Sequence, residues 1–270
     1  LYCEDFGEGP SILFICGGNL THKSWDSQVA AFANSYRCVT FDWRGTGASD
    51  KPRTGYTAAV ATGDVIELIE RLGLGPTVLV GHGLGAHLAL LAAEAKPALV
   101  KGLFLASAAP WFSGERDGMT GGVSEEFYEF IVMQRRGAKM GIRVPYAETL
   151  FELGDKWLFH KKQSPGLCQT ILDQALEWPQ HVLNCYAEDM RSIDHRVRAK
   201  SIKCPTVILG GRHDRKQRYE GGVHLARMIP GARLVTLENS CTMGNVEEVD
   251  AFNNTLASFV SSLEQQRQVA

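Results

Sequence analysis

No stretch of the chain is apolar over the roughly 18 residues that a membrane-crossing helix needs. No CxxC pair occurs among the seven cysteines, and their odd number argues against a disulfide framework or a zinc site. No phosphate loop or dinucleotide fingerprint is present either. Charge of one sign is also lacking, because the formal net charge is only −2. We therefore expect no metal, no cofactor, no membrane contact and no nucleic-acid partner.

The cysteines lie scattered, several of them in apolar segments where they are typical of small core residues. That usage favours a reducing, cytoplasmic compartment. Apolar residues make up 44% of the 270 positions, enough for one large domain with a sizeable core. No charged-then-apolar leader opens the chain. Its first residue is Leu1 and not Met, so we expect its start to be trimmed. The sequence does not determine the oligomeric state, and a homodimer is one possibility.

Short apolar segments, each followed by a helical pattern, alternate at both ends of the chain. Strands are predicted at 11–16, 37–42, 77–80, 101–106, 206–209 and 234–237. This alternation predicts an α/β fold with a mostly parallel, doubly wound sheet. Residues 110–200 contain aromatic-rich helical stretches and no convincing strand. We therefore predict a core made of residues 1–109 and 201–270, with a helical cap at 110–200 inserted into it.

Residues 77–88 read TVLVGHGLGAHL, a strand, a glycine-rich turn and a helix. In many enzymes such a turn carries a serine nucleophile in the pattern Gly-x-Ser-x-Gly. Two further segments, FDWRGTGASD at 41–50 and GGRHD at 210–214, each lie at the end of a predicted strand. Their order and spacing match two loops of the same class of enzymes, and the second of these loops carries an acid. Together these three segments, spread over nearly the whole chain, resemble the α/β-hydrolase superfamily of the AB hydrolase-1 type. The resemblance implies the α/β-hydrolase fold with an inserted cap.

The chain departs from the family pattern at two of the three catalytic positions. Gly83 stands where the serine nucleophile is expected, and glycine has no side chain that could attack. The loop before the last helix reads ENSCTMG at 238–244, with Cys241 about where the family's histidine lies. Only Asp214 remains, as the acid. The sequence therefore predicts an atypical member with a degenerate triad.

The oxyanion hole of this fold is made by backbone amides, which a side-chain substitution does not remove. Leu84 can supply one amide, and Gly17, Gly18 or Asn19 the other. The helix that begins behind Leu84 adds a partial positive charge. A carbonyl oxygen could still be held there after the attacking group is lost.

Each remaining candidate has two interpretations. Asp214 is a base, or it only braces its loop. Cys241 is a nucleophile, or it is a small buried core residue. His82 and His22 contact a substrate, or they are a structural and a surface histidine. Gly83 relieves backbone strain, or it makes room for a substrate atom or a water.

Aromatic residues of the predicted cap line an apolar pocket or pack the cap onto the sheet. They are Trp111, Phe112, Phe127, Trp157 and Trp178. A small, largely apolar carbonyl compound is the expected ligand. The first function expected is a non-hydrolytic enzyme, an isomerase, epimerase, lyase or cyclase. The alternatives are an esterase- or lactonase-type hydrolase in which Asp214 activates water, and a ligand-binding protein without activity.

Overall fold

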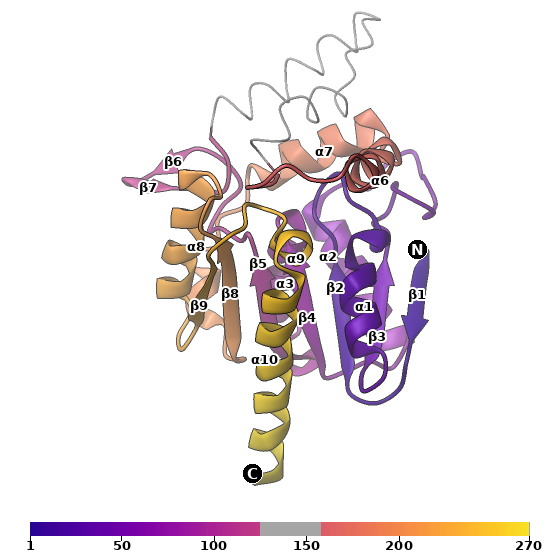
Figure 1. Cartoon of the computed structure of the whole chain (residues 1–270), viewed down its shortest axis with the longest axis vertical. Helices are drawn as coiled ribbons and strands as arrows, with labels where there is room; N and C mark the ends of the chain where they lie inside the picture. Colours follow the sequence, from indigo (N-terminus) through magenta and orange to yellow (C-terminus); the bar gives the residue numbers. More distant parts are fainter. Residues whose placement is uncertain (125–157, 270) are drawn as a thin grey trace, which may run out of the picture.

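The computed structural model describes residues 1–124 and 158–269, and a seven-stranded sheet forms its centre (Figure 1). In spatial order the strands are β1 (Cys3–Phe6), β3 (Arg37–Phe41), β2 (Ser11–Ile15), β4 (Thr77–His82), β5 (Val100–Ala106), β8 (Thr206–Gly211) and β9 (Arg233–Leu237). Within this sheet β1 is antiparallel to β3, and every other neighbouring pair is parallel. The predicted mostly parallel sheet is confirmed.

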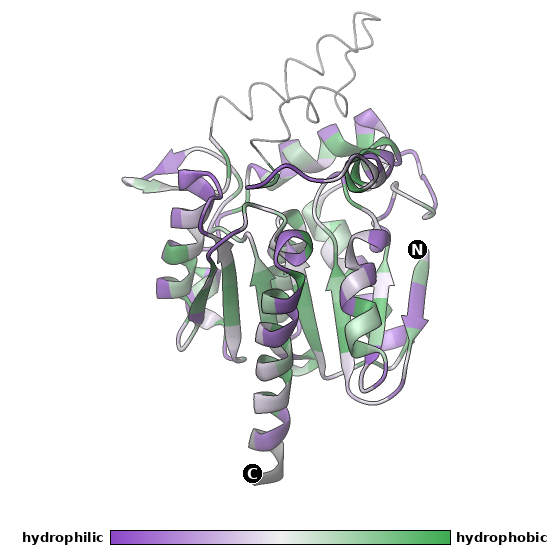
Figure 2. Cartoon of the chain, in the orientation of Figure 1, coloured by the Kyte–Doolittle hydropathy of each residue, from purple (hydrophilic) through white to green (hydrophobic). Residues whose placement is uncertain are grey.

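The central strands form the core because both of their faces are covered. Every residue of β2, β4 and β8 is buried, and the hydropathy colouring is green along the middle of the sheet (Figure 2). A parallel sheet buried on both faces needs continuous apolar runs rather than alternation. This is why segments such as SILFI were recognisable as strands from the sequence.

Helices cover the two faces of the sheet (Figure 1). α1 and α10 lie on the face toward the viewer, and α2 and α3 lie behind it. α8 packs against β8 and β9. The bounds are α1 (Asp26–Phe32), α2 (Ala58–Arg71), α3 (Leu84–Ala95), α8 (Lys216–Met228), α9 (Gly244–Glu247) and α10 (Val249–Val269).

Three short strands were not predicted. The edge strand β1 contains Glu4 and Asp5 and is half exposed, so it shows no apolar run. Its backbone hydrogen bonds to β3 hold it in place instead. A small hairpin, β6 (Glu115–Arg116) and β7 (Met119–Thr120), lies within 110–200, where no strand was predicted. Strands of two residues leave no period in the sequence.

Two helices, α6 (Pro165–Leu176) and α7 (Gln180–Met190), lie above the carboxyl ends of the strands (Figure 1). Hydrogen bonds fix them there: Trp178 Nε1 donates to the Leu20 carbonyl at 2.7 Å, and the Tyr186 hydroxyl donates to the Arg44 carbonyl at 3.2 Å. Both aromatic rings also pack on Trp43, with centroids 5.7 and 5.2 Å away. The part of the predicted cap at 125–157 lies outside the described residues.

Among the helices of the described ranges, none has the combination of length and apolar character that crossing a bilayer requires.

Candidate active site

The turn between β4 and α3 keeps a strained backbone although its central residue is glycine. Gly83 has φ 52° and ψ −114°, a conformation that side-chain-bearing residues adopt only at a cost. On one side of it, Gly85 allows the helix to touch the neighbouring strand, because a Cβ there would collide with the carbonyl oxygens of Ile15 and Cys16. A Cβ on Gly83, by contrast, would meet nothing within 4 Å. The turn is intact and the place of its central side chain is empty space.

A cavity of about 140 Å³ opens at this turn. The walls are largely apolar and come from the turn, from the loop after β2 and from α6 and α7. The polar side chains among the lining residues are Asn19, His82, His87, Ser107, Arg215, Arg218 and Thr242. The apolar ones include Leu20, Leu84, Phe112, Val123, Leu158, Ile171, Leu172, Leu183 and Met243.

The predicted oxyanion groups lie together at one wall. Leu84 is the first residue of α3, so its N–H has no carbonyl partner within the helix. Gly17 and Gly18 line the same cavity, and a Cβ on Gly18 would lie 2.9 Å from the Leu84 side chain. The loop after β2 therefore runs directly beside the start of α3. This arrangement is compatible with an oxyanion hole.

Asp214 lies just behind the cavity wall in a network of hydrogen bonds. Its Oδ1 accepts from the Thr242 hydroxyl at 2.8 Å and from the Arg215 backbone N–H at 2.8 Å. Its Oδ2 lies 3.3 Å from the Ser107 hydroxyl. Asp214 is buried and is not itself among the lining residues, whereas Ser107 and Thr242 are. Both hydroxyls therefore stand between the cavity and the carboxylate, and the Ser107 hydroxyl also lies 3.0 Å from the Thr242 carbonyl oxygen.

Cys241 lies beside that carboxylate, with Sγ 3.9 Å from Asp214 Oδ1. Burial, together with the negative charge of Asp214, raises the pKa of Cys241 to about 11. A thiol with that pKa stays protonated near neutral pH and is a weak nucleophile. The environment of Cys241 favours the interpretation as a small buried residue.

His82 lines the cavity floor and is held by the loop that contains Cys241. Its Nε2 donates to the Thr242 carbonyl at 3.0 Å, so in the neutral ring Nδ1 carries no proton. Within the described ranges, that buried Nδ1 has no hydrogen-bond partner. Chiefly through burial, the pKa of His82 is lowered to about 4. His82 is therefore a neutral, tightly held side chain at the cavity.

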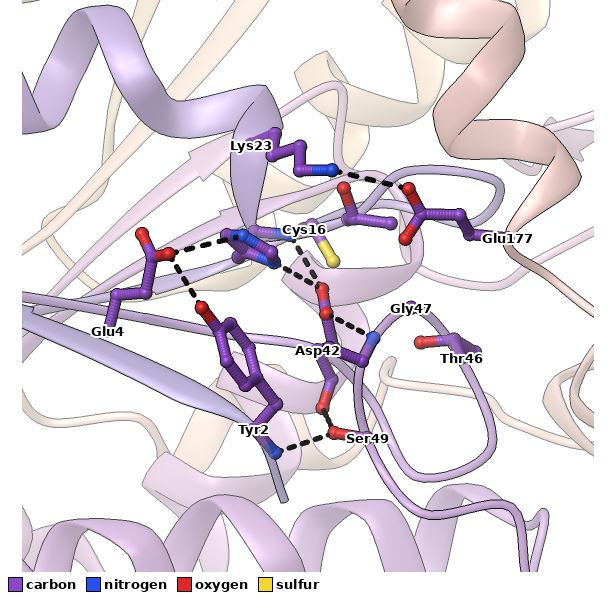
Figure 3. A network of polar contacts seen from close by, with 12 residues as sticks. Tyr2, Glu4, Cys16, Lys23, Asp42, Thr46, Gly47, Ser49 and Glu177 are labelled. Carbon is purple, nitrogen blue, oxygen red and sulfur yellow. Dashed lines mark hydrogen bonds and ion pairs between the residues drawn. The ribbon is translucent and has the colours of Figure 1, made fainter.

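His22 does not line the cavity. Its Nδ1 and its backbone N–H lie 2.9 and 2.8 Å from Asp42 Oδ1, and its Nε2 lies 3.5 Å from Glu4. Figure 3 shows the Glu4 and Asp42 carboxylates of this network. The hydrogen bond to Asp42 raises the pKa of His22. Burial alone would raise the pKa of Asp42, but the hydrogen bonds from His22 and Ala48 hold it below its usual value. The Asp42 carboxylate thus ties two loops at the strand ends together.

Replacing Asp42 with asparagine is expected to lower the free energy of unfolding by about 2 kcal/mol, because buried hydrogen bonds to a charged group are lost. Urea unfolding at pH 7 measures the effect. Asp50→Asn, at an exposed carboxylate on the same loop, serves as the control. An unchanged midpoint for Asp42→Asn would contradict this role.

Of the five aromatic residues expected at the pocket, Phe112 lines the cavity. Trp111 is fully buried, donates to the Gly114 carbonyl and does not line it. Trp178 packs on the core as described above. Trp157 and Phe127 lie outside the described residues.

A buried pair of histidines at the cavity was missed from the sequence. His87, which lines the cavity, places Nδ1 2.8 Å from Nε2 of His195. Burial lowers the pKa of His87 to about 4. Burial is also the largest cause that lowers the pKa of His195 well below its usual value. The sequence did contain one signal that His87 could reach the cavity: it lies four residues after Gly83, and residues four apart share one face of a helix. His195 lies 108 positions further along, and nothing in the sequence pairs them.

Three further lining residues had escaped notice. Ser107 follows the carboxyl end of β5, where side chains of parallel sheets meet ligands, and its φ of 48° is in the left-handed region. Arg215 and Arg218 come at the start of α8, three residues apart and hence on one face.

A mostly parallel sheet, a sharp strained turn after its central strand and a cavity at that turn define an α/β-hydrolase-fold protein. The chain belongs to the alpha/beta hydrolase family, whose model matches residues 12–240. The family expectation from the sequence is thereby confirmed.

Relatives and solved structures agree on this family. AB hydrolase superfamily protein YisY of Bacillus subtilis (strain 168) is 31% identical over 265 residues, covering 97% of this chain and 96% of that protein. The 2-(acetamidomethylene)succinate hydrolase of Mesorhizobium japonicum is 34% identical over 115 residues, 43% of this chain and 41% of that protein. An esterase, EaEST from Exiguobacterium antarcticum, has a TM-score of 0.87 at 26% identity, covering 96% of this chain and 95% of that one.

The expectation of an isomerase, epimerase, lyase or cyclase is wrong. Similar proteins are named as hydrolases, among them the succinate-derivative hydrolase and the esterase. The physical reason is that the missing groups at positions 83 and 241 argue only against attack by a serine. They leave attack by water on a bound carbonyl untouched.

Proposed function

We propose that the protein is a hydrolase of small, largely apolar esters or lactones that works without the family's serine and histidine. The observation that carries this proposal is the empty space at Gly83 inside a cavity that borders the Leu84 amide and the Gly17–Gly18 loop. In this proposal the triad is degenerate at positions 83 and 241. The segment 110–200 acts as the cap, because α6 and α7 within it supply apolar wall residues.

Water takes the place of the missing side chain. The substrate carbonyl oxygen accepts hydrogen bonds from Leu84 and the loop after β2, and one such donor contributes about 3 kcal/mol in other enzymes. Water attacks the carbonyl carbon and passes a proton to Ser107, whose own proton moves to Asp214, 3.3 Å away. When the tetrahedral intermediate collapses, the leaving oxygen takes that proton back by the same route.

The relatives support this reading of the chemistry. The esterase resembles this chain over nearly its full length, and the succinate-derivative hydrolase resembles nearly half of it. His82 lines the cavity and stays a candidate for contact with the substrate, whereas Cys241 lies behind the wall beside Asp214 and is a candidate that the raised pKa of its thiol argues against.

Asp214→Asn is expected to lower kcat for p-nitrophenyl butyrate or a γ-lactone by about 100-fold, because the proton acceptor is lost. Turnover is measured on purified wild type, Asp214→Asn and Ser107→Ala, with Asp50→Asn as the exposed-carboxylate control. If the hydrolytic activity copurifies with the protein and is unchanged in Asp214→Asn, the proposed proton transfer through Ser107 to Asp214 is contradicted. Ligand binding without any hydrolysis would support the ligand-binding protein instead.

A further inference from the structure

The cavity carries positive charge and no negative charge on its described walls. Arg215 and Arg218 are its two charged lining residues in the described ranges, and both come from the start of α8. Most of the remaining wall is aliphatic. A guanidinium in apolar surroundings is costly unless an anion or several hydrogen bonds compensate it.

Arg218 has only weak compensation from the protein. Its Nε donates to the Gly122 carbonyl at 3.3 Å and its Nη1 to the Thr242 hydroxyl at 3.4 Å, both long bonds to neutral groups. Among the described residues no carboxylate forms an ion pair with it. Since a guanidinium has five N–H donors in a planar fork, most of them donate to none of the described residues and can bind a ligand.

The charge of Arg218 also reaches the floor of the cavity. After burial, it is the next cause that lowers the pKa of His87, and it contributes to the lowered pKa of His82. The reaction centre and the guanidinium therefore share one electrostatic environment. Arg218 and Leu84 line the same cavity, so a ligand with an anionic group at Arg218 and a carbonyl at Leu84 would occupy that one cavity.

We propose that Arg218 binds a carboxylate of the substrate, so that the protein acts on small acyl compounds that carry a free carboxylate. The planar fork matches a carboxylate bidentately. The cavity of about 140 Å³ has the size of an engineered cavity that accommodates benzene, so the apolar part is small. As a substrate class this rests on the proposed hydrolase function, whereas the anion site itself does not.

Binding of benzoate and of its neutral isostere benzamide tests the site without requiring turnover. By calorimetry at pH 7, the wild type is expected to bind benzoate at least about tenfold more tightly than benzamide, the difference a charged hydrogen-bonded pair supplies. Arg218→Met keeps the aliphatic stem and is expected to abolish that ratio. Arg218→Lys keeps the charge and is expected to retain part of it. Arg227→Met, at an exposed position of the same helix, is the matched control and should leave the ratio unchanged.

The outcomes separate this inference from the proposed function. Equal binding of benzoate and benzamide by the wild type, or a ratio that persists in Arg218→Met, overturns the carboxylate site. If neutral esters are still hydrolysed in that case, the proposed hydrolase function stands. A benzoate preference that depends on Arg218, in a chain that hydrolyses no ester or lactone, supports the anion site and overturns only the hydrolase.

Discussion

A chain that carries both Gly83→Ser and Cys241→His is expected to hydrolyse p-nitrophenyl butyrate about 10²–10⁴ times faster than the wild type, the range that a positioned general base contributes. If the triad is degenerate as proposed, the double variant supplies a nucleophile and a base next to Asp214. The gain should be far from additive, because the members of a triad act as a unit.

The geometry supports the substitution at position 83, and the contact of Cys241 with Asp214 is the reason for choosing position 241. A Cβ on Gly83 has no neighbour within 4 Å, so a serine side chain fits without displacing anything. Its backbone already has the strained φ of 52°, which for serine costs about 1–3 kcal/mol of stability. At the second position, Cys241 Sγ lies 3.9 Å from Asp214 Oδ1, close enough for an imidazole there to be oriented by the carboxylate.

Matched variants distinguish restoration from other effects. Gly83→Ala with Cys241→His carries the same backbone strain without a nucleophile, and each single substitution lacks one partner. A fluorophosphonate probe should covalently label the serine introduced at position 83 in the double variant only. If the double variant folds and shows no gain and no labelling, position 241 is not aligned with the turn.

The free energy of unfolding is expected to fall steeply between pH 6.5 and pH 4. His82 and His87 are neutral in the fold, with pKa values lowered to about 4, while in the unfolded chain they take up protons near pH 6.5. Above pH 6.5 these groups leave stability unchanged. As the pH falls toward 4, each favours the unfolded chain by up to about 3 kcal/mol.

His195 acts in the same direction, since its pKa is also lowered. His22 acts in the opposite direction, because its pKa is raised and its pairing with Asp42 strengthens when it is protonated. Urea unfolding at pH 7 and pH 4.5 should show a smaller loss for His87→Gln than for the wild type. His181→Gln, at an exposed histidine, should leave the loss unchanged. Equal losses in wild type and His87→Gln would contradict a buried neutral His87.

The strands and the turn could be predicted because their physical signals are local. Continuous apolar runs mark buried parallel strands, and the glycines of GHGLGA mark a turn where backbones touch. The edge strand β1 could not be predicted, since its main chain rather than its side chains holds it in the sheet.

The site was only partly predictable for a similar reason. Asp214 was found because GGRHD resembles the family's acid-bearing loop, and the structure places Cys241 beside it. The contact between His87 and His195, and the convergence of Arg218 with Thr242, join residues far apart in the chain. Such pairs have no spacing rule, so only the tertiary fold brings them together. The error about the reaction had another origin: Gly83 and Cys241 at the expected triad positions were given more weight than the alternative of hydrolysis by water that Asp214 activates.

The packing of Trp178 and Tyr186 on Trp43 has a consequence for how a ligand enters. Swinging α7 outward would break that aromatic cluster together with the hydrogen bonds to the Leu20 and Arg44 carbonyls. Each release of product and entry of substrate would then require much of the free energy needed to separate α7 from the core. Traffic to the cavity is therefore expected to leave α6 and α7 in place, as a fixed wall past which substrate and product diffuse.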